Sequence, residues 1–235
     1  MNNFLPSVSV IITNYNYAQF VCSAIQSAID QNYPNIKEII IVDDRSTDNS
    51  VEIIKKFLEN QKYTKRDFRL IINNQNGGPA GARNSGILAA TGDILSFLDA
   101  DDLYYPDKIS KSIPYFLQPE VALVYSDYMV MDIKKNTFQI EFKHSYDLRM
   151  LMNSCIISTN SLMRMSAVQK VGLFDIRFRG TEDYHMYLKL SRENILIHIP
   201  EVLFMYRLHG KNITTTTNHN QFAYDIASFK RELNI

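Results

Sequence analysis

The chain has 235 residues, 46% of them hydrophobic and 21% charged, which is an ordinary composition for a folded domain with a sizeable core. Lysine plus arginine equals aspartate plus glutamate, at 25 each, and this balance argues against nucleic acid as the main partner. Two cysteines, Cys22 and Cys155, cannot form a disulfide framework, and their apolar surroundings indicate buried thiols in a reducing compartment.

Membrane and targeting signals are the next feature to examine. No apolar run approaches the roughly 18 residues of a membrane-spanning helix, and no signal peptide opens the chain. We therefore expect a cytoplasmic protein, and a position at the inner face of the plasma membrane stays compatible with the sequence.

The first half of the chain alternates short apolar segments with helical patterns. Strands are predicted over residues 8–13, 39–42, 69–72 and 94–98. Helices are predicted over residues 20–29, 47–58 and 80–90, and Ser46 or Thr47 is the expected cap of the second helix. Continuous apolar strands alternating with helices indicate a mostly parallel sheet covered on both faces. Ligands of such sheets bind beyond the carboxyl ends of the strands.

The second half is less regular. A strand is predicted over residues 121–126, and a β excursion over residues 128–131 and 137–142. An amphipathic helix over residues 182–192 precedes two strands, 195–199 and 202–208, which flank Pro200. A polar stretch over residues 214–220 leads to a last helix, 221–233, whose apolar stripe we expect to pack against the body. The absence of repeats and long linkers indicates one domain over residues 1–235.

Three carboxylates follow the strand over residues 94–98. Residues i and i+2 of an extended segment project to one side, so Asp99 and Asp101 can converge on one ion while Asp102 projects elsewhere. Clustered carboxylates suit Mg²⁺ or Mn²⁺. The alternative is that the acidic triplet only ends the strand and caps the next helix.

Polar residues also follow the first two strands. Residues 13–16 lack the glycines of a dinucleotide-binding turn or a phosphate-binding loop. The Thr13 hydroxyl and the Tyr15 ring could instead hold a base, and Asp44 could accept a hydrogen bond from a pyrimidine imide or a ribose hydroxyl. Alternatively, Tyr15 is an aromatic residue at a helix entry and Asp44 a charge near a helix N-terminus, although Asp48 fits that role better.

Three further groups of residues could take part in binding or catalysis. Arg83 lies one turn into a helix opened by glycines, where it could pair with a pyrophosphate or with nearby carboxylates, or simply lie on the surface. Asp183, next to Glu182 at a predicted helix start, could be a general base or a helix cap. His209 could be a third metal ligand, a phosphate contact or a surface imidazole.

Five stretches in this order resemble the inverting GT-A glycosyltransferases of family 2, of the bacterial glycan-assembly type. They are residues 8–16, 42–48, 81–84, 98–102 and 181–183. The resemblance implies an α/β GT-A fold, with a Rossmann-like, mostly parallel central sheet, helices on both faces and a small β excursion. It also implies a nucleotide-sugar-binding half over residues 1–103 and an acceptor-binding half over residues 104–235 that ends in a helix.

The resemblance also implies roles for individual residues. The residues implied to bind the nucleotide-sugar donor are Thr13, Tyr15, Asp44, Arg83, Asp99, Ala100 and Asp101. Asp101 matches the metal-ligating acid of the family's DXD motif, and Asp99 and His209 are the further candidate ligands of Mn²⁺ or Mg²⁺. Asp183 matches the catalytic base, with Glu182 as its neighbour.

The expected activity is therefore metal-dependent, inverting transfer of a hexosyl or N-acetylhexosaminyl unit. The donor is a nucleotide-sugar, with UDP favoured by Asp44, and the acceptor is a hydroxyl of a glycan or lipid-linked molecule in cell-surface polysaccharide synthesis. A sugar-1-phosphate nucleotidyltransferase would share the sheet and the metal, but it should carry a glycine-rich loop after the first strand. A non-catalytic nucleotide-binding module would explain Asp44 but not the later acidic residues.

Overall fold

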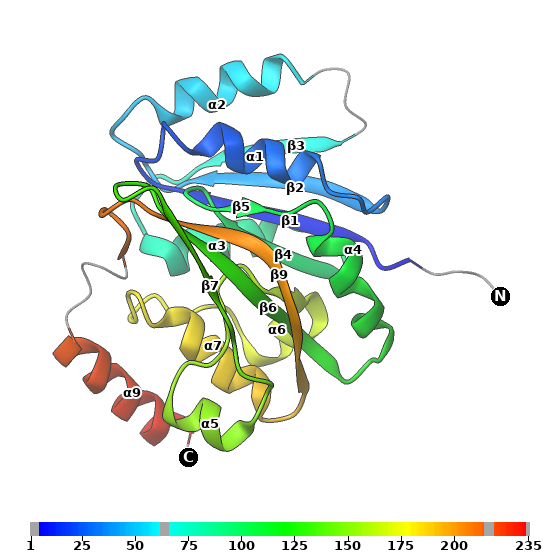
Figure 1. The fold of residues 1–235 in the computed structure, drawn as a ribbon, viewed down its shortest axis with the longest axis vertical. Helices are drawn as coiled ribbons and strands as arrows, with labels where there is room; N and C mark the ends of the chain where they lie inside the picture. Colours follow the sequence, from blue (N-terminus) through cyan, green and yellow to red (C-terminus); the bar gives the residue numbers. More distant parts are fainter. Residues whose placement is uncertain (1–4, 62–65, 214–218, 234–235) are drawn as a thin grey trace.

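A computed structural model describes residues 5–61, 66–213 and 219–233, so residues 214–218 of the predicted polar stretch lie outside the described residues. The chain forms a mixed sheet with helices on both faces (Figure 1). The strands are β1 (Val8–Asn14), β2 (Ile36–Asp43), β3 (Asp67–Ile72), β4 (Ile94–Asp99), β5 (Leu103–Tyr104), β6 (Val121–Asp132), β7 (Thr137–Glu141), β8 (Leu162–Arg164) and β9 (Ile195–Leu208). Their order across the sheet is β3-β2-β1-β4-β8-β6-β9-β5, and β7 pairs with β6.

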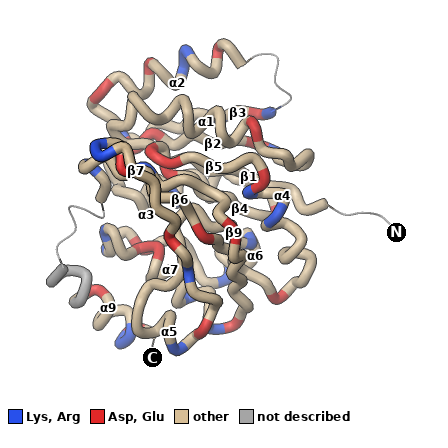
Figure 2. Tube along the Cα trace, in the orientation of Figure 1, with Lys and Arg blue, Asp and Glu red and all other residues tan. Residues whose placement is uncertain are grey.

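The helices connect these strands. They are α1 (Val21–Ile29), α2 (Ser50–Glu59), α3 (Gly78–Ala89), α4 (Lys108–Ser112), the 3₁₀ helix η1 (Ile113–Leu117), α5 (Leu148–Asn153), α6 (Met165–Val171), α7 (Glu182–Ser191) and α9 (His219–Leu233). Within the described ranges, none of these helices combines the length and the apolar character needed to cross a bilayer. Figure 2 shows basic and acidic positions interspersed along the trace.

The parallel half of the sheet confirms the prediction from the apolar runs. Strand β1 pairs in parallel with β2 and β4, and β2 pairs in parallel with β3. Each of these four strands lies within three residues of its predicted bounds. Beyond β4 the sheet becomes mixed, because β8 runs antiparallel to both β4 and β6, whereas β6 and β9 are parallel.

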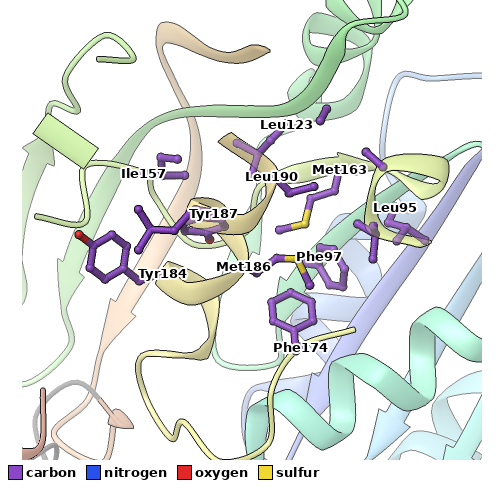
Figure 3. Packing of buried hydrophobic residues seen from close by; sticks show 14 of the residues in the cluster. Leu95, Phe97, Leu123, Ile157, Met163, Phe174, Tyr184, Met186, Tyr187 and Leu190 are labelled. Atoms are coloured by element: carbon purple, nitrogen blue, oxygen red, sulfur yellow. The ribbon is translucent and has the colours of Figure 1, made fainter. Parts of the chain in front are cut away.

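Two apolar cores cover the two faces of the sheet. Alternation along β1 sends Ile11 into the core beneath α3 and α7, and Val10 and Ile12 into the core beneath α1 and α2. Figure 3 shows part of the first core, where Phe97 of β4 lies near Phe174 and Met186. Helix α3 approaches β1 so closely that a Cβ on Gly86 would overlap with Ile11 Cγ2.

Three predicted boundaries were wrong, each for a local reason. Helix α2 begins at Ser50 after the N-cap residue Asn49, because the Ser46 hydroxyl donates to Asp43 Oδ2 (2.7 Å) instead of capping the helix. Residues 195–199 and 202–208 form one strand, β9, because a register break opposite β6 accommodates Pro200. Residues 121–126 and 128–131 are likewise one strand, β6, which forms a hairpin with β7.

Helix α9 packs against the body, as its apolar stripe predicted. The Phe229 ring is fully buried, and its centroid lies 4.4 Å from that of Phe178. Leu233 is also buried in the core that contains α7. The last helix therefore contacts the segment that leads into α7.

Candidate active site

The carboxyl ends of β1, β2 and β4 open onto a cleft of about 880 Å³, its mouth included. The predicted site residues that line it are Thr13, Tyr15, Asp44, Arg83, Asp99, Asp101, Glu182 and Asp183. The side chain of Ala100 is fully buried, and the His209 ring lies behind Asp101 without lining the cleft. Lining residues that were not assigned from the sequence are Asn14, Tyr17, Asn76, Gly78, Pro79, Ala82, Thr159, Arg179, Gly180, Tyr206, Asn212 and Ile213.

Asp44 occupies the end of the cleft beyond β2. Its Oδ1 accepts hydrogen bonds from Asn73 Nδ2 (2.7 Å) and from the backbone N–H of Gly77 (3.0 Å). Its Oδ2 is buried and has no hydrogen-bond partner in the described part of the chain. An unpaired buried carboxylate oxygen is costly, so this atom is suited to accept from a ligand N–H. The Tyr15 ring, 40% exposed, lines the same cleft.

Arg83 joins two acidic residues across the cleft floor. Its Nη1 donates to Glu182 Oε1 (2.6 Å), and its Nη2 donates to Asp99 Oδ1 (3.1 Å). The Arg83 side chain is almost fully buried, and its guanidinium lies 5.6 Å from the Phe174 ring centroid. Of the roles considered from the sequence, the structure shows pairing with carboxylates. The Thr13 hydroxyl also donates to Asp99 Oδ1 (3.0 Å).

Asp101 has different partners from Asp99. Its Oδ2 contacts His209 Nε2 (3.0 Å) and accepts a hydrogen bond from Asn212 Nδ2 (3.3 Å). The backbone N–H of Lys211 donates to His209 Nδ1 (3.3 Å), which places the imidazole proton on Nε2, facing Asp101. The rings of Tyr17 and Phe20 flank this imidazole.

Asp102 points away from the cleft, as the strand geometry predicted. Its Oδ2 accepts from Asn160 Nδ2 (2.6 Å), and its Oδ1 accepts from the backbone N–H of Arg207 (3.1 Å). Burial and the charges of Asp101 and Asp99 raise the pKa of the Asp102 carboxyl well above its ordinary value. Asp102 therefore supports the fold, since it fixes the segments that carry Asn160 and Arg207.

The side chains around Asp101 fit a hard divalent cation whose coordination shell is completed by oxygens of the substrate. Within the described residues, no group of three His, Cys, Asp or Glu side chains is arranged to hold a metal ion. Mg²⁺ and Mn²⁺ sites commonly use one or two carboxylates together with phosphate oxygens of the substrate. Asp101 supplies one such carboxylate at the cleft wall, whereas Asp99 is bound by Arg83 and Thr13.

Glu182 and Asp183 are the first two residues of α7, and their carboxylates differ in the hydrogen bonds that they accept. Both Glu182 oxygens have partners, because Oε1 binds Arg83 and Oε2 accepts from the Gly180 N–H (2.6 Å). Asp183 is half-buried, and its Oδ1 accepts from the Tyr184 N–H (2.7 Å). Burial and the adjacent Glu182 charge raise the pKa of Asp183 to about 7, against the lowering effect of Arg83. Asp183 can therefore take up a proton near neutral pH.

Comparison with known proteins gives a consistent result. Residues 9–172 match the family model described as Glycosyl transferase family 2. An uncharacterized glycosyltransferase of Rickettsia prowazekii (strain Madrid E) is 32% identical over 234 residues, covering 95% of this chain and 71% of that protein. One from Haemophilus influenzae is 36% identical over 136 residues, covering 58% of this chain and 52% of the other.

Solved structures show the same fold. S. aureus TarS 1–349 in complex with UDP superimposes with a TM-score of 0.73 at 19% identity, over 95% of this chain and 64% of that one. The mannosyltransferase PcManGT from Pyrobaculum calidifontis, in complex with GDP-Man and Mn²⁺, gives 0.71 at 21% identity, over 94% and 60%. The chain thus spans less than two thirds of each of these solved chains. At these identities the likeness is one of fold, and it confirms the predicted α/β GT-A architecture.

Proposed function

Since the chain belongs to glycosyl transferase family 2 and is a glycosyltransferase, we propose that it is a metal-dependent, inverting enzyme with a UDP-sugar donor. The family match decides in favour of glycosyl transfer over the nucleotidyltransferase and the non-catalytic module. The transferred group is a hexosyl or N-acetylhexosaminyl unit. The observation that carries the proposal is that Asp101 and Asp183 line one cleft. The pKa of Asp183 is raised to about 7.

The donor binds along the ends of β1, β2 and β4, within the half formed by residues 1–103. Oδ2 of Asp44, which has no hydrogen-bond partner among the described residues, accepts a hydrogen bond from the imide N–H of uracil, and the exposed Tyr15 ring stacks on the base. Among the structural neighbours, TarS has been solved with UDP and with UDP-GlcNAc, and PcManGT with GDP-Man. These neighbours support a nucleotide-sugar donor, and Asp44 is our reason for choosing uracil.

Asp101 would hold the cation, Mn²⁺ or Mg²⁺, together with phosphate oxygens of the donor. When bound, such a cation neutralises the negative charge that develops on the leaving diphosphate. His209 orients the Asp101 carboxylate through Nε2, and the Lys211 N–H keeps the imidazole in that tautomer. Asp99 holds Arg83 instead, so we assign it to positioning of the site.

Transfer follows from the position of Asp183. The Asp183 carboxylate takes the proton of the acceptor hydroxyl, whose oxygen attacks the anomeric carbon on the side opposite to UDP. The new carbon–oxygen bond forms as the bond to the diphosphate breaks, and a single displacement inverts the anomeric centre. A pKa near the working pH suits a general base. Glu182, held by Arg83 and Gly180, fixes the first turn of α7 beneath this base.

The acceptor enters from the half formed by residues 104–235, which supplies α7. We propose a glycan or lipid-linked acceptor for cell-surface polysaccharide synthesis, reached in the cytoplasm or at the inner face of the plasma membrane. The test is release of UDP from a panel of UDP-sugars, with Mn²⁺ and with a chelator. We expect Mn²⁺-dependent release from at least one UDP-sugar, and preferential turnover of GDP-sugars would contradict the donor assignment.

A further inference from the structure

The cleft is lined by more negatively charged than positively charged side chains. Five carboxylates face it, those of Asp44, Asp99, Asp101, Glu182 and Asp183. The cations in the described lining are two guanidinium groups, Arg83 and Arg179. Arg83 is buried and already neutralised by Asp99 and Glu182. Arg179 is exposed and makes no ion pair with any described residue, although it shares the cleft with all five carboxylates.

The backbone on both sides of Arg179 is held in place. Phe178 is buried, with ring contacts to Phe229 (4.4 Å between centroids) and to His185 (5.0 Å). Gly180 donates its N–H to Glu182 Oε2 (2.6 Å). The free guanidinium therefore projects from a fixed segment, and it is available to an incoming anion.

The Arg179 side chain reaches across the cleft toward the start of α3. Its Nε lies 3.8 Å from the position that a Cβ would take on Gly78. Arg179 also lies four residues before Asp183, so the guanidinium and the proposed base belong to one segment of the cleft wall. Asp101, which we propose to hold the cation at the diphosphate, by contrast follows β4.

We propose that Arg179 binds an anionic group of the acceptor, a phosphate or a carboxylate near the hydroxyl that is glycosylated. This inference rests on the proposed transferase function, and it defines the acceptor class as anionic. Arg83 offsets part of the charge of Asp99 and Glu182, but the carboxylates that line the cleft still outnumber its cations, so an anionic acceptor needs a cation of its own. Arg179 supplies that cation with a planar guanidinium, which matches both phosphate and carboxylate geometry.

Calorimetry with a small probe tests this assignment without any need for turnover. The probe is glycerol 3-phosphate, which carries hydroxyls and a phosphate, and glycerol is its uncharged counterpart. Both are titrated into the protein alone and into the protein saturated with UDP and Mn²⁺. The variants are Arg179→Gln and, as a matched control, Arg177→Gln, an exposed arginine outside the cleft lining that pairs with Asp175 and Glu232.

We expect glycerol 3-phosphate to bind wild-type protein and Arg177→Gln equally, and Arg179→Gln about fivefold more weakly, as for a solvent-accessible ion pair. Glycerol should bind none of them measurably. Equal affinity in Arg179→Gln, or no binding to wild type, overturns the proposal. A loss of UDP affinity in Arg179→Gln, with unchanged affinity for glycerol 3-phosphate, would assign Arg179 to the donor and also overturn it. Failure of wild type to bind UDP counts against the donor proposal alone, because the titration without nucleotide still reports on Arg179.

Discussion

Arg83 and Glu182, 99 residues apart in the chain, form a buried ion pair with Nη1 and Oε1 2.6 Å apart. The pair joins α3, which packs on β1 through Gly86, to the first turn of α7, which carries Asp183. The proposed donor side and the proposed acceptor side of the cleft are therefore linked by one guanidinium. This linkage makes the geometry of the proposed base dependent on Arg83.

Removal of Arg83 alone should destabilise the fold. In Arg83→Met the buried Glu182 carboxylate loses its cation, and breaking a buried pair costs about 3–5 kcal/mol. The double variant Arg83→Met/Glu182→Gln removes the uncompensated charge and should recover part of this loss. Urea unfolding of both variants measures the free energies, and equal stability of the single and double variants would contradict the role of the pair.

The rate of transfer should depend on the protonation of Asp183. Because the pKa of Asp183 is raised to about 7, kcat/KM should rise as the pH increases toward 7 and level off above it. The pH profile of UDP release by wild type measures this directly. A profile that stays flat between pH 5 and 8, a range of about one unit or more on either side of that pKa, would exclude Asp183 as the base.

The same raised pKa predicts a gain of stability in Asp183→Asn. Between the ordinary aspartate value of 3.8 and about 7, the folded protein binds more protons at this site than the unfolded chain does. Stability therefore falls as the pH rises through this window. Asp183→Asn removes the effect, so the variant should be more stable than wild type above pH 7, by on the order of 1–3 kcal/mol. This difference should shrink toward pH 4, and thermal unfolding at both pH values tests it.

Nucleobase preference should follow Asp44. Its Oδ2 can accept a hydrogen bond from the uracil imide N–H, which cytosine lacks, so UDP should bind more tightly than CDP. In Asp44→Asn one oxygen remains for Asn73 and Gly77, and the amide then presents a donor to the base. UDP affinity should fall about tenfold or more, whereas CDP affinity should be retained. Calorimetry that shows equal losses for the two nucleotides would argue against this contact.

Substitution of Asp101 should lower metal-dependent turnover, whereas substitution of Asp102 should lower stability. Asp101→Asn keeps the shape of the side chain but removes the charge proposed to hold the cation, so Mn²⁺-dependent turnover should fall below about a tenth of wild type while the fold persists. Asp102→Ala instead leaves Asn160 and the Arg207 N–H unpaired in a buried position, which should cost about 1–3 kcal/mol of stability. Melting temperatures and Mn²⁺ titrations separate the two effects.

The parallel half of the fold was predictable because β1, β2 and β4 are buried on both faces and therefore read as continuous apolar runs, whereas the edge strand β3 is only partly buried. The meeting of Asp44, Asp99 and Asp101 at one sheet edge follows from the same geometry. Strands β5 and β8 and helices α5 and α6 were not predicted, since they are two to seven residues long and too short to show a hydrophobic periodicity. Their positions depend on tertiary pairing.

Side-chain partners were harder to predict than positions. The sequence indicates that Arg83 could bind carboxylates, but spacing cannot select Glu182, which lies 99 residues away. His209 meets Asp101 through the placement of β9 in the sheet, and the Lys211 N–H sets its tautomer. Arg179 lies in a segment singled out for Glu182 and Asp183, yet only the three-dimensional structure shows that it makes no ion pair with any described residue.

The central claim is that Asp183 is the general base of a UDP-sugar-dependent transferase. Its most direct test is UDP release from the best UDP-sugar of the panel by wild type and by Asp183→Asn, with UDP affinity measured by calorimetry on the same preparations. We predict a loss of turnover of about 10²-fold or more in the variant, with unchanged UDP affinity. Turnover above about a tenth of wild type, or loss of UDP binding in Asp183→Asn while Glu182→Gln alone stops transfer, would contradict the assignment.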